Sequence, residues 1–313
     1  MNYTLHQLQI FLKIVETKSI TKAAEELHLT QPAVSIQLKK LQDQFDVPLT
    51  EVIGRQVYIT HFGSDIAQTA QRIVDEMATI TYKSMSYQGN LSGKLTLSVV
   101  STGKYVMPFF LSEFLQQHPG VDLEMDVTNK TKVVKSLENN AVDFALVSIL
   151  PQNLALQTEV LLENKLYLVG NRSLAAQYPT NQQALLETHP LIYREAGSAT
   201  RMVMENYLKN RGLDSVKKIQ LTSNEAVKQA VIAGIGCSIM PIIGLKNELE
   251  KGELSLIPMK GFPIKSNWHL VWLKNKSLSP VAQAYLAYIK DQKNNIKNNS
   301  FSWIDMHLSK KKQ

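Results

Sequence analysis

Residues 19–41 read SITKAAEELHLTQPAVSIQLKKL, and this stretch decides the fold of the N-terminal region. Ser19 or Thr21 can begin a short helix that ends in a tight turn. After the turn, Thr30 can cap a further helix, with Pro32 in its first turn, where the missing backbone N–H costs nothing. Two helices joined in this way predict a helix-turn-helix.

The flanking residues complete a small three-helix domain with a wing. Residues 5–15 carry apolar side chains at helical spacing, and Thr4 can cap that helix. Two short extended pieces, 50–53 and 56–60, are separated by a Gly-Arg pair at 54–55. This pattern predicts a hairpin.

One face of the third helix is the candidate DNA-reading surface, because it lies opposite the apolar stripe of Val34, Leu38 and Leu41. Gln and Ser side chains can bond to base edges, whereas Lys and Arg can reach phosphates or the minor groove. A solvated polar helix face would have a similar composition, so that alternative stays open. The predicted DNA-contacting residues are Thr30, Gln31, Pro32, Ser35, Ile36, Lys39 and Arg55.

A long helix is predicted from about residue 62 to 87, followed by a glycine-containing linker at 89–93. Its apolar or small residues recur in alternating steps of four and three, which is the seam of a coiled coil. We expect this seam to pair with a second copy of the chain, although an intramolecular core would use the same residues. The seam residues are Ile66, Ala70, Ile73, Met77 and Ile80.

From residue 94 onward short apolar runs alternate with helical patterns, which predicts an α/β fold with mostly parallel sheets. Residues 293–313 show little periodicity and are rich in Asn and Lys, so they are predicted to be a mobile basic tail. Strands are expected at 95–100, 121–127, 144–149, 166–169 and 268–273, and helices at 108–118, 132–139, 200–211, 223–233 and 280–290.

The net charge of +7 does not by itself indicate nucleic-acid binding. Residues 1–60 hold six basic and six acidic side chains, whereas residues 290–313 hold six Lys and two Asp. More than half of the excess charge therefore lies in the tail, and the prediction of DNA binding rests on pattern.

Several classes of protein are disfavoured. The single cysteine, Cys237, lies in an apolar run and is interpreted as a small buried side chain. The seven His lack metal-ligand spacing, and there is no nucleophile elbow, phosphate loop or dinucleotide fingerprint. The glycines at 234 and 236 follow a predicted helix and are read as a helix end. We expect no metal, no cofactor and no catalytic activity.

No stretch approaches the ~18 apolar residues of a membrane span, and no basic segment followed by an apolar run begins at Met1. We therefore expect a cytoplasmic protein with no membrane contact.

Over about residues 5–290 the chain resembles the LysR-type transcriptional regulators. The N-terminal residues that carry the resemblance are Leu8, Phe11, Val15, Ser19, Ala23, Ala24, Leu27, residues 31–35, Leu41 and residues 60–63. Segments 101–105, 194–201 and 223–230 are similar to regulators of Calvin-cycle carboxylase operons.

The chain departs from the family pattern at Gln42, Asp46, Thr50 and Val52. Asp46 replaces a helix-ending Gly, which would cost up to ~1 kcal/mol if the backbone there required a positive φ. Thr50 lacks a buried aromatic ring at the wing base, and Val52 lacks a phosphate contact.

The resemblance implies a winged helix-turn-helix, a long linker helix, and an effector domain of two α/β lobes arranged like periplasmic binding proteins. It also implies promoter DNA, RNA polymerase and further copies of the chain as partners, in a homodimer or a tetramer. The implied boundaries are 1–61, 62–92 and 93–292, with lobe I at 93–163 and 266–292, lobe II at 164–265, and the tail at 293–313.

An effector is expected between the lobes, where loops at 101–103, 197–200 and 222–224 place hydroxyl or N–H groups at helix starts. Such groups favour a small anion, although ordinary helix capping remains an alternative. The predicted effector-binding residues are Ser101, Thr102, Lys104, Thr128, Asn129, Ser148, Ser198, Thr200, Arg201, Ser223 and Asn224. A secreted solute receptor would share the two lobes, and an enzyme remains the other rival class.

Overall fold

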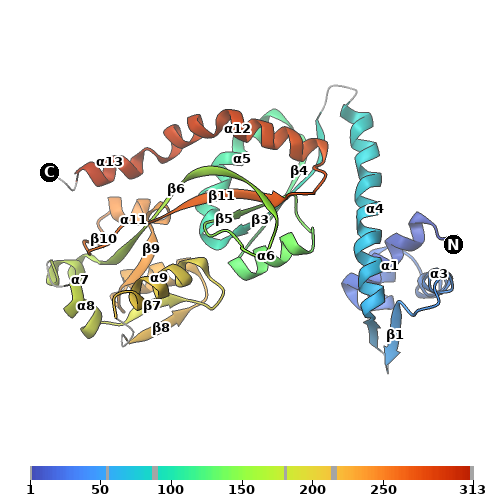
Figure 1. The fold of residues 1–313 in the computed structure, drawn as a ribbon, viewed down its shortest axis with the longest axis horizontal. Helices are drawn as coiled ribbons and strands as arrows, with labels where there is room; N and C mark the ends of the chain where they lie inside the picture. The colour runs from blue at the N-terminus through green and yellow to red at the C-terminus, as the bar shows by residue number, and fades with distance from the viewer. Residues whose placement is uncertain (1, 54–55, 87–90, 180–181, 213–216, 311–313) are drawn as a thin grey trace. The chain divides into compact units, whose positions relative to one another are not determined.

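The computed structural model describes residues 2–53, 56–86, 91–179, 182–212 and 217–310 (Figure 1). The chain divides into two compact units, residues 1–90 and residues 91–313. Each unit has its own hydrophobic core, so each is described by itself.

Three short helices and a hairpin form the N-terminal unit, as the sequence predicts. Side-chain oxygens of Thr4, Ser19 and Thr30 accept hydrogen bonds at the starts of the first three helices. Phe11 and Leu41 are fully buried between these helices. The elements are α1 (Leu5–Thr17), α2 (Ile20–Glu26), α3 (Gln31–Gln42), β1 (Thr50–Ile53), β2 (Gln56–Ile59) and α4 (His61–Ser86).

The first turns of α4 belong to this core, which corrects part of the predicted seam. Ala70 is 2% exposed, and Ile66 packs against the same cluster. Both side chains are used within one chain because α4 packs along α1. Ile73 and Met77 are 41% and 45% exposed, whereas the side chain of Ile80 lies outside the described residues.

Two of the departures from the family pattern, Gln42 and Asp46, are accommodated at the end of α3 and in the chain that leads to the wing. Asp46 is not among the residues with positive φ, so the backbone cost considered for this position does not arise. Gln42 Oε1 accepts a hydrogen bond from Leu49 N at 2.6 Å, and Gln42 Nε2 donates to Val47 O at 3.3 Å. The Gln42 side chain therefore ties the end of α3 to the chain entering the wing.

The second unit contains a seven-stranded sheet in the order β10-β6-β11-β5-β3-β4, with β9 also paired to β6, and a smaller parallel sheet of β7 and β8. The strands are β3 (Ser92–Val100), β4 (Gly120–Thr128), β5 (Phe144–Val147), β6 (Leu156–Asn171), β7 (Leu191–Arg194), β8 (Lys218–Leu221), β9 (Ser238–Pro241), β10 (Leu254–Ile257) and β11 (Ile264–Leu273).

The expectation of mostly parallel sheets is wrong. In the large sheet only β4 and β5 pair in parallel with β3, whereas β6 is antiparallel to β9, β10 and β11. The reason is that two long strands, β6 and β11, run beside each other from one lobe to the other (Figure 1). The implied crossing points near 163 and 265 fall within these paired strands, where Asn164 lies opposite Ser266.

Two buried clusters fill the second unit, and the larger one extends from lobe I to residues of lobe II such as Val231 and Leu249. One is centred on Trp268, Phe144 and Tyr285, and the other includes Leu185, Tyr193 and Met204. The helical elements around them are η1 (Ser101–Tyr105), α5 (Met107–Gln117), α6 (Lys130–Glu138), α7 (Arg172–Gln177), α8 (Gln182–Thr188), α9 (Ala199–Lys209), α10 (Asn224–Ile232), η2 (Ile242–Gly244), α11 (Lys246–Glu250), α12 (Pro280–Phe301) and α13 (Trp303–Lys310).

The predicted mobile tail is helical up to residue 310, so this prediction is wrong. The helix expected at 280–290 continues to Phe301, and α13 follows it across the second unit (Figure 1). Ile296, Phe301 and Ile304 are buried against the larger core cluster, with 5–8% of each exposed. Their irregular spacing among Asn and Lys residues hides them from a search for helical periodicity.

Cys237 is fully buried, which confirms its interpretation as a packed side chain, and burial raises the pKa of its thiol to about 12. Within the described residues, no group of three or more His, Cys, Asp or Glu side chains could hold a metal ion. None of the described helices combines the length and apolar character needed to cross a membrane.

Candidate DNA-binding and effector-binding sites

The outer face of α3 presents most of the predicted DNA-contacting side chains to solvent. Gln31, Pro32, Ile36 and Lys39 are exposed, and Ile36 is 54% exposed despite being apolar. Gln31 Nε2 donates to Ser35 Oγ at 3.0 Å, so these two polar groups lie together on this face. The surface combines hydrogen-bonding groups, an apolar side chain and a cation, which suits a major groove.

Two other predicted DNA contacts have different outcomes. Thr30 Oγ1 accepts from Ala33 N at 3.4 Å, so its hydroxyl caps α3. Arg55 lies outside the described residues. The wing instead exposes two apolar side chains that sequence reasoning missed, Val52 and Ile53, each more than 60% exposed.

The two lobes contact each other between the end of β4 and the start of α9. A Cβ atom built at Gly197, which has φ +86°, would lie 2.6 Å from Thr131 Oγ1 and 3.8 Å from Asn129 Cγ. Lys130 Nζ lies 3.9 Å from Met202 Sδ. The start of α6 in lobe I therefore lies against the start of α9 and the preceding Gly197 in lobe II.

Lys130 is a cation at this contact that sequence reasoning missed. Its side chain is half-buried, and desolvation lowers its pKa. No carboxylate among the described residues pairs with it. An anion bound beside Lys130 would supply the missing charge partner. The sequence carries no local signal for this role, because a lysine in the first turn of a helix is ordinarily solvated.

A second interlobe contact joins η1 to the start of α10. The Tyr105 hydroxyl donates to Glu225 Oε2 and accepts from Asn224 Nδ2, each at 3.3 Å. Burial raises the pKa of Tyr105. Asn224, a predicted effector-binding residue of lobe II, is thus bonded to lobe I through Tyr105. Tyr105 was not among the predicted effector-binding residues.

Several predicted effector-binding hydroxyls are buried and make no hydrogen bond within the described part of the chain. Thr102 and Ser148 come from lobe I, whereas Ser198 and Thr200 come from lobe II, and each is at most 9% exposed. Ser101 and Thr128 are partly exposed and likewise make no side-chain hydrogen bond to described residues. None of these hydroxyl oxygens is among the fully buried, partnerless polar atoms of the described residues, so the oxygens still reach solvent although their side chains are packed. A polar ligand that enters between the lobes can therefore bond to them.

Two other predicted residues serve as ordinary helix caps. Asn129 Oδ1 accepts from Lys132 N at 3.1 Å, and Ser223 Oγ accepts from Ala226 N at 3.0 Å. Ser198 occupies the same position before α9 but makes no side-chain capping bond. The start of α9 thus differs from the starts of α6 and α10.

The cations predicted at the helix starts have partners elsewhere. Arg201 Nε donates to Glu205 Oε1 at 2.7 Å, and Arg201 Nη1 donates to Gln220 Oε1 at 2.6 Å. Lys104 Nζ lies over the Tyr105 ring, 5.1 Å from its centroid.

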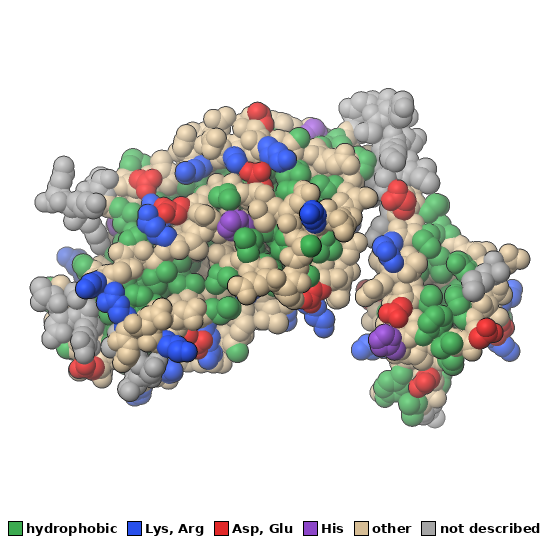
Figure 2. Space-filling model, viewed as in Figure 1, with side chains coloured by type: hydrophobic (Ala, Val, Ile, Leu, Met, Phe, Trp, Pro, Cys, Tyr) green, Lys and Arg blue, Asp and Glu red, His purple; other side chains and the backbone are tan. Residues whose placement is uncertain are grey.

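Arg194, which was not predicted, is 4% exposed and pairs with Glu195 through bonds of 2.8 and 2.9 Å. Basic and acidic side chains are interspersed over the visible face of the effector unit (Figure 2), so charge alone does not identify a site there.

Comparison with known proteins identifies the parts of the chain. Bacterial regulatory helix-turn-helix protein, lysR family, matches residues 5–64, and LysR substrate binding domain matches residues 88–294. The HTH-type transcriptional activator CmpR of Synechocystis is 38% identical over 293 residues, covering 92% of this chain and 95% of that protein. A RuBisCO operon transcriptional regulator of Allochromatium vinosum is 35% identical, with 92% of this chain and 96% of that protein covered.

Solved structures give the same architecture. The regulatory domain of Synechocystis PCC6803 CcmR, in complex with 2-PG, matches with a TM-score of 0.60 and 33% identity, over 65% of this chain and 99% of that chain. Full-length CbnR complexed with its target DNA matches with a TM-score of 0.66 over 92% of this chain and 99% of that chain. At 19% identity the CbnR match concerns the fold alone.

These matches confirm the predicted winged helix-turn-helix followed by a two-lobed effector-binding domain. The chain belongs to the LysR family of DNA-binding transcriptional regulators.

Proposed function

We propose that this regulator senses a small anion, a phosphorylated or carboxylated metabolite, bound between its two lobes. The observation that carries the proposal is the set of four hydroxyls on the packed residues Thr102, Ser148, Ser198 and Thr200, which come from both lobes, make no hydrogen bond to described residues and still reach solvent. A polar ligand would bond to them in place of water.

Two further features favour negative charge in the ligand. The first N–H groups of α9 have no side-chain cap from Ser198, and the positive end of a helix dipole attracts anions. Lys130 adds a half-buried cation without a carboxylate partner among the described residues. The 2-PG in the CcmR complex, 2-phosphoglycolate, has this chemistry.

Ligand binding would act on DNA through the lobes. A ligand shifts a conformational equilibrium only when it binds the two states unequally. Gly197 fits against Thr131 with no room for a Cβ atom, so contacts across the site depend on how closely the lobes approach. An anion that touches Lys130 and the start of α9 together would favour the closely packed arrangement.

The DNA-reading surface in this proposal is the outer face of α3. Gln31, Pro32 and Ser35 would face base edges, with Ile36 beside them, and Lys39 would contact the backbone. Arg55 is proposed as a further backbone contact. The protein would work in the cytoplasm on promoter DNA, in contact with RNA polymerase, without catalysing a reaction.

Self-association would place two of these surfaces on one DNA. Ile73 and Met77 form an exposed apolar pair on α4, one helical turn apart. We propose that they contact a second copy of the chain, and that effector domains add a further interface in a tetramer.

Changing both Ile73 and Met77 to Glu should abolish binding to a probe with two half-sites, because two buried carboxylates would oppose pairing of the helices. Light scattering should show a smaller particle. A variant with unchanged mass and unchanged DNA binding would contradict this role, and Ser64→Glu on exposed α4 surface provides a matched control for added charge.

The ligand proposal is tested by calorimetric titration of the full chain with 2-phosphoglycolate, with glycolamide as an uncharged comparison. Thr102→Ala and Ser198→Ala should each weaken binding by about tenfold, since each removes a hydrogen bond to a charged group. Ser173→Ala, at an exposed serine in lobe II, should leave the affinity unchanged. Equal affinity for glycolamide, or equal affinity of all variants, would contradict the proposal.

A further inference from the structure

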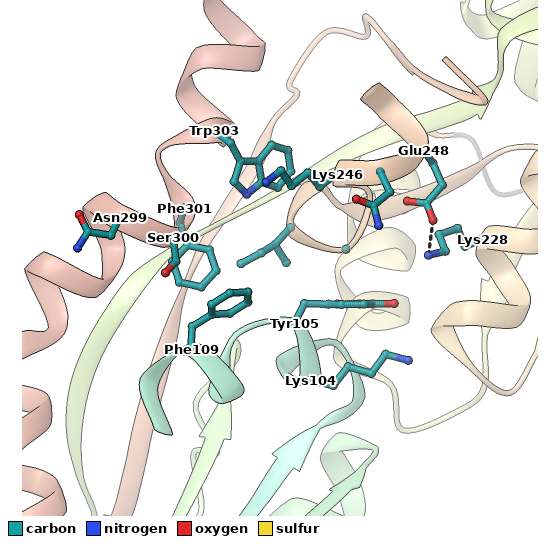
Figure 3. A pocket seen from close by; sticks show the side chains of 13 residues that line it. Lys104, Tyr105, Phe109, Lys228, Lys246, Glu248, Asn299, Ser300, Phe301 and Trp303 are labelled. Carbon is teal, nitrogen blue, oxygen red and sulfur yellow. Dashed lines mark ion pairs between the residues drawn. The ribbon is translucent and has the colours of Figure 1, made fainter. Parts of the chain in front are cut away.

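A cavity of about 540 Å³ lies between η1, α5, α11 and the last turn of α12 (Figure 3). Its volume is in the range of small-molecule sites. Phe109 and Phe301 meet edge to face with ring centroids 5.2 Å apart, and Trp303 lines the same cavity. Phe109 is 49% exposed, so its ring is open to an incoming molecule. The cavity therefore offers an aromatic surface.

The cavity also carries uncompensated positive charge. Three lysines and one carboxylate line it. Lys228 Nζ lies 3.0 Å from Glu225 Oε1 and 2.6 Å from Glu248 Oε1. The three lysines therefore exceed these two carboxylates by one positive charge. Lys104 and Lys246 have only ring contacts, with Tyr105 at 5.1 Å and Trp303 at 5.8 Å, and no carboxylate among the described residues pairs with either.

The end of the chain makes part of this cavity. Asn299, Ser300, Phe301 and Trp303 line it, and all four lie beyond residue 294, where the match to the LysR substrate binding domain ends. Lys165 Nζ bonds to Asp305 Oδ1 at 2.9 Å, and Lys293 pairs with Glu159, so this C-terminal segment is fixed to the long strand β6 on both sides of the cavity. The segment from 295 to 310 thus supplies a wall.

We propose that this cavity is a second ligand site, which takes an amphipathic anion: an aromatic ring bearing a sulfonate, phosphate or carboxylate. The ring would lie against Phe109, Phe301 and Trp303, and the anionic group would contact Lys246 and Lys104. None of the buried interlobe hydroxyls lines this cavity, so the site is distinct from the proposed effector site. Because its walls come from both lobes and from the C-terminal segment, a ligand here would act on the same conformational equilibrium from a different place.

The test uses anilinonaphthalene sulfonate (ANS), an aromatic sulfonate whose fluorescence rises in apolar surroundings, and N-phenylnaphthylamine, which has the same rings without the charge. ANS should bind the full chain at one site, with energy transfer from tryptophan, to which Trp303 contributes from the cavity wall. Lys246→Gln should weaken ANS by about fivefold, the range of a partly solvated ion pair, and should change N-phenylnaphthylamine binding little. Lys297→Gln, an exposed lysine of α12 outside the cavity, is the matched control.

The second part of the test removes the C-terminal segment that forms one wall of the cavity. A chain ending at Asn298 should lose the site, whereas a chain ending at Lys310 keeps every lining residue and should bind ANS normally. Because ANS also binds loosened proteins, near-ultraviolet circular dichroism must show native packing in each variant. Trp303→Leu, which keeps the segment, should reduce the energy transfer to the share from Trp268 and Trp272, and it should weaken binding even if the shortened chain misfolds.

Excess 2-phosphoglycolate should change the affinity for ANS only up to a limiting value, because the two ligands share a conformational equilibrium and not a site. The proposal is overturned if natively packed protein does not bind ANS, or if 2-phosphoglycolate weakens ANS binding without reaching a limit, as a competitor does. It is also overturned if Lys246→Gln and Trp303→Leu bind ANS as the original chain does.

Discussion

The two candidate sites of this regulator differ in where their polar side chains lie. On α3 the candidate residues Gln31 and Lys39 project into solvent from one helix. In the effector unit Thr102 and Ser198 are at most 6% exposed and come from segments about 100 positions apart. The DNA-reading surface consists of side chains that the core leaves outside, whereas the effector site consists of hydroxyls on packed side chains, which reach solvent and have no partner among the described residues.

This difference determines what each site can recognise. An exposed, preformed face suits a rigid macromolecular surface such as a DNA groove. Enclosed hydroxyls and a half-buried cation suit a small ligand that replaces water completely. A substitution that unfolds one unit should therefore leave the binding activity of the other unit intact.

The largest effect should come from the core of the N-terminal unit. Phe11 is fully buried, and Phe11→Ala should destabilise that unit by about 3–5 kcal/mol. Specific DNA binding should disappear in mobility-shift assays. Calorimetry should still detect 2-phosphoglycolate with unchanged affinity, because Phe11 belongs to a different core. Loss of both activities together would show that the units do not fold separately.

The next effect concerns the cation between the lobes. Lys130→Gln should weaken 2-phosphoglycolate binding by about 1.5–3 kcal/mol, because it removes a hydrogen bond between charged groups. Binding of ligand-free protein to DNA should persist. Lys135→Gln, an exposed lysine of the same helix, controls for the lost charge. Equal affinities of the two variants would remove Lys130 from the site.

Two substitutions on α3 should separate base contacts from backbone contacts. Gln31→Ala should cost about 1–3 kcal/mol on the specific site and little on random DNA. Lys39→Ala should weaken binding to both DNAs and flatten the dependence on salt. Fluorescence anisotropy at several salt concentrations measures both effects. If the two variants lose equally on both DNAs, this assignment of roles is incorrect.

The smallest effect should come from substitution of Arg201, although its place at a helix start suggested that Arg201 binds the anion. Its guanidinium group already contacts Glu205 and Gln220. Arg201→Ala should cost at most about 1 kcal/mol of stability, as a partly exposed ion pair does. Its affinity for 2-phosphoglycolate should match that of the original chain. A tenfold loss in calorimetry would show that Arg201 leaves these partners to bind the ligand.

Local sequence patterns predicted the features that local interactions determine. Thr30 and Pro32 start α3 where expected, and Gly234, with φ +78°, follows the end of α10 as its position after a helix suggested. Long-range pairing was not visible in this way. The 16 residues of β6 are extended because β9, β10 and β11 pair along them, whereas only four of those residues were predicted as a strand.

Burial explains the remaining differences. Ala70 shows seam spacing, yet it packs against α1, because a small residue suits a close helix contact as well as a coiled coil. Phe301 lies in a polar stretch of sequence. It is buried because its ring packs against Phe109 and Phe110 of α5, a contact that the surrounding sequence does not indicate. Lys130 and Tyr105 contact residues of the opposite lobe, Met202 and Glu225. Such a contact joins two segments that are far apart in the chain, so the sequence around either one does not show it.

The most direct test of the account is a footprint of the full chain on its own promoter region, with and without 2-phosphoglycolate, in the original chain and in Thr102→Ala. We expect the ligand to change the footprint of the original chain and to leave that of Thr102→Ala unchanged, while both bind DNA similarly without ligand. A footprint that 2-phosphoglycolate leaves unaltered in the original chain, or alters equally in Thr102→Ala, would contradict the claim that an anion between the lobes controls DNA binding.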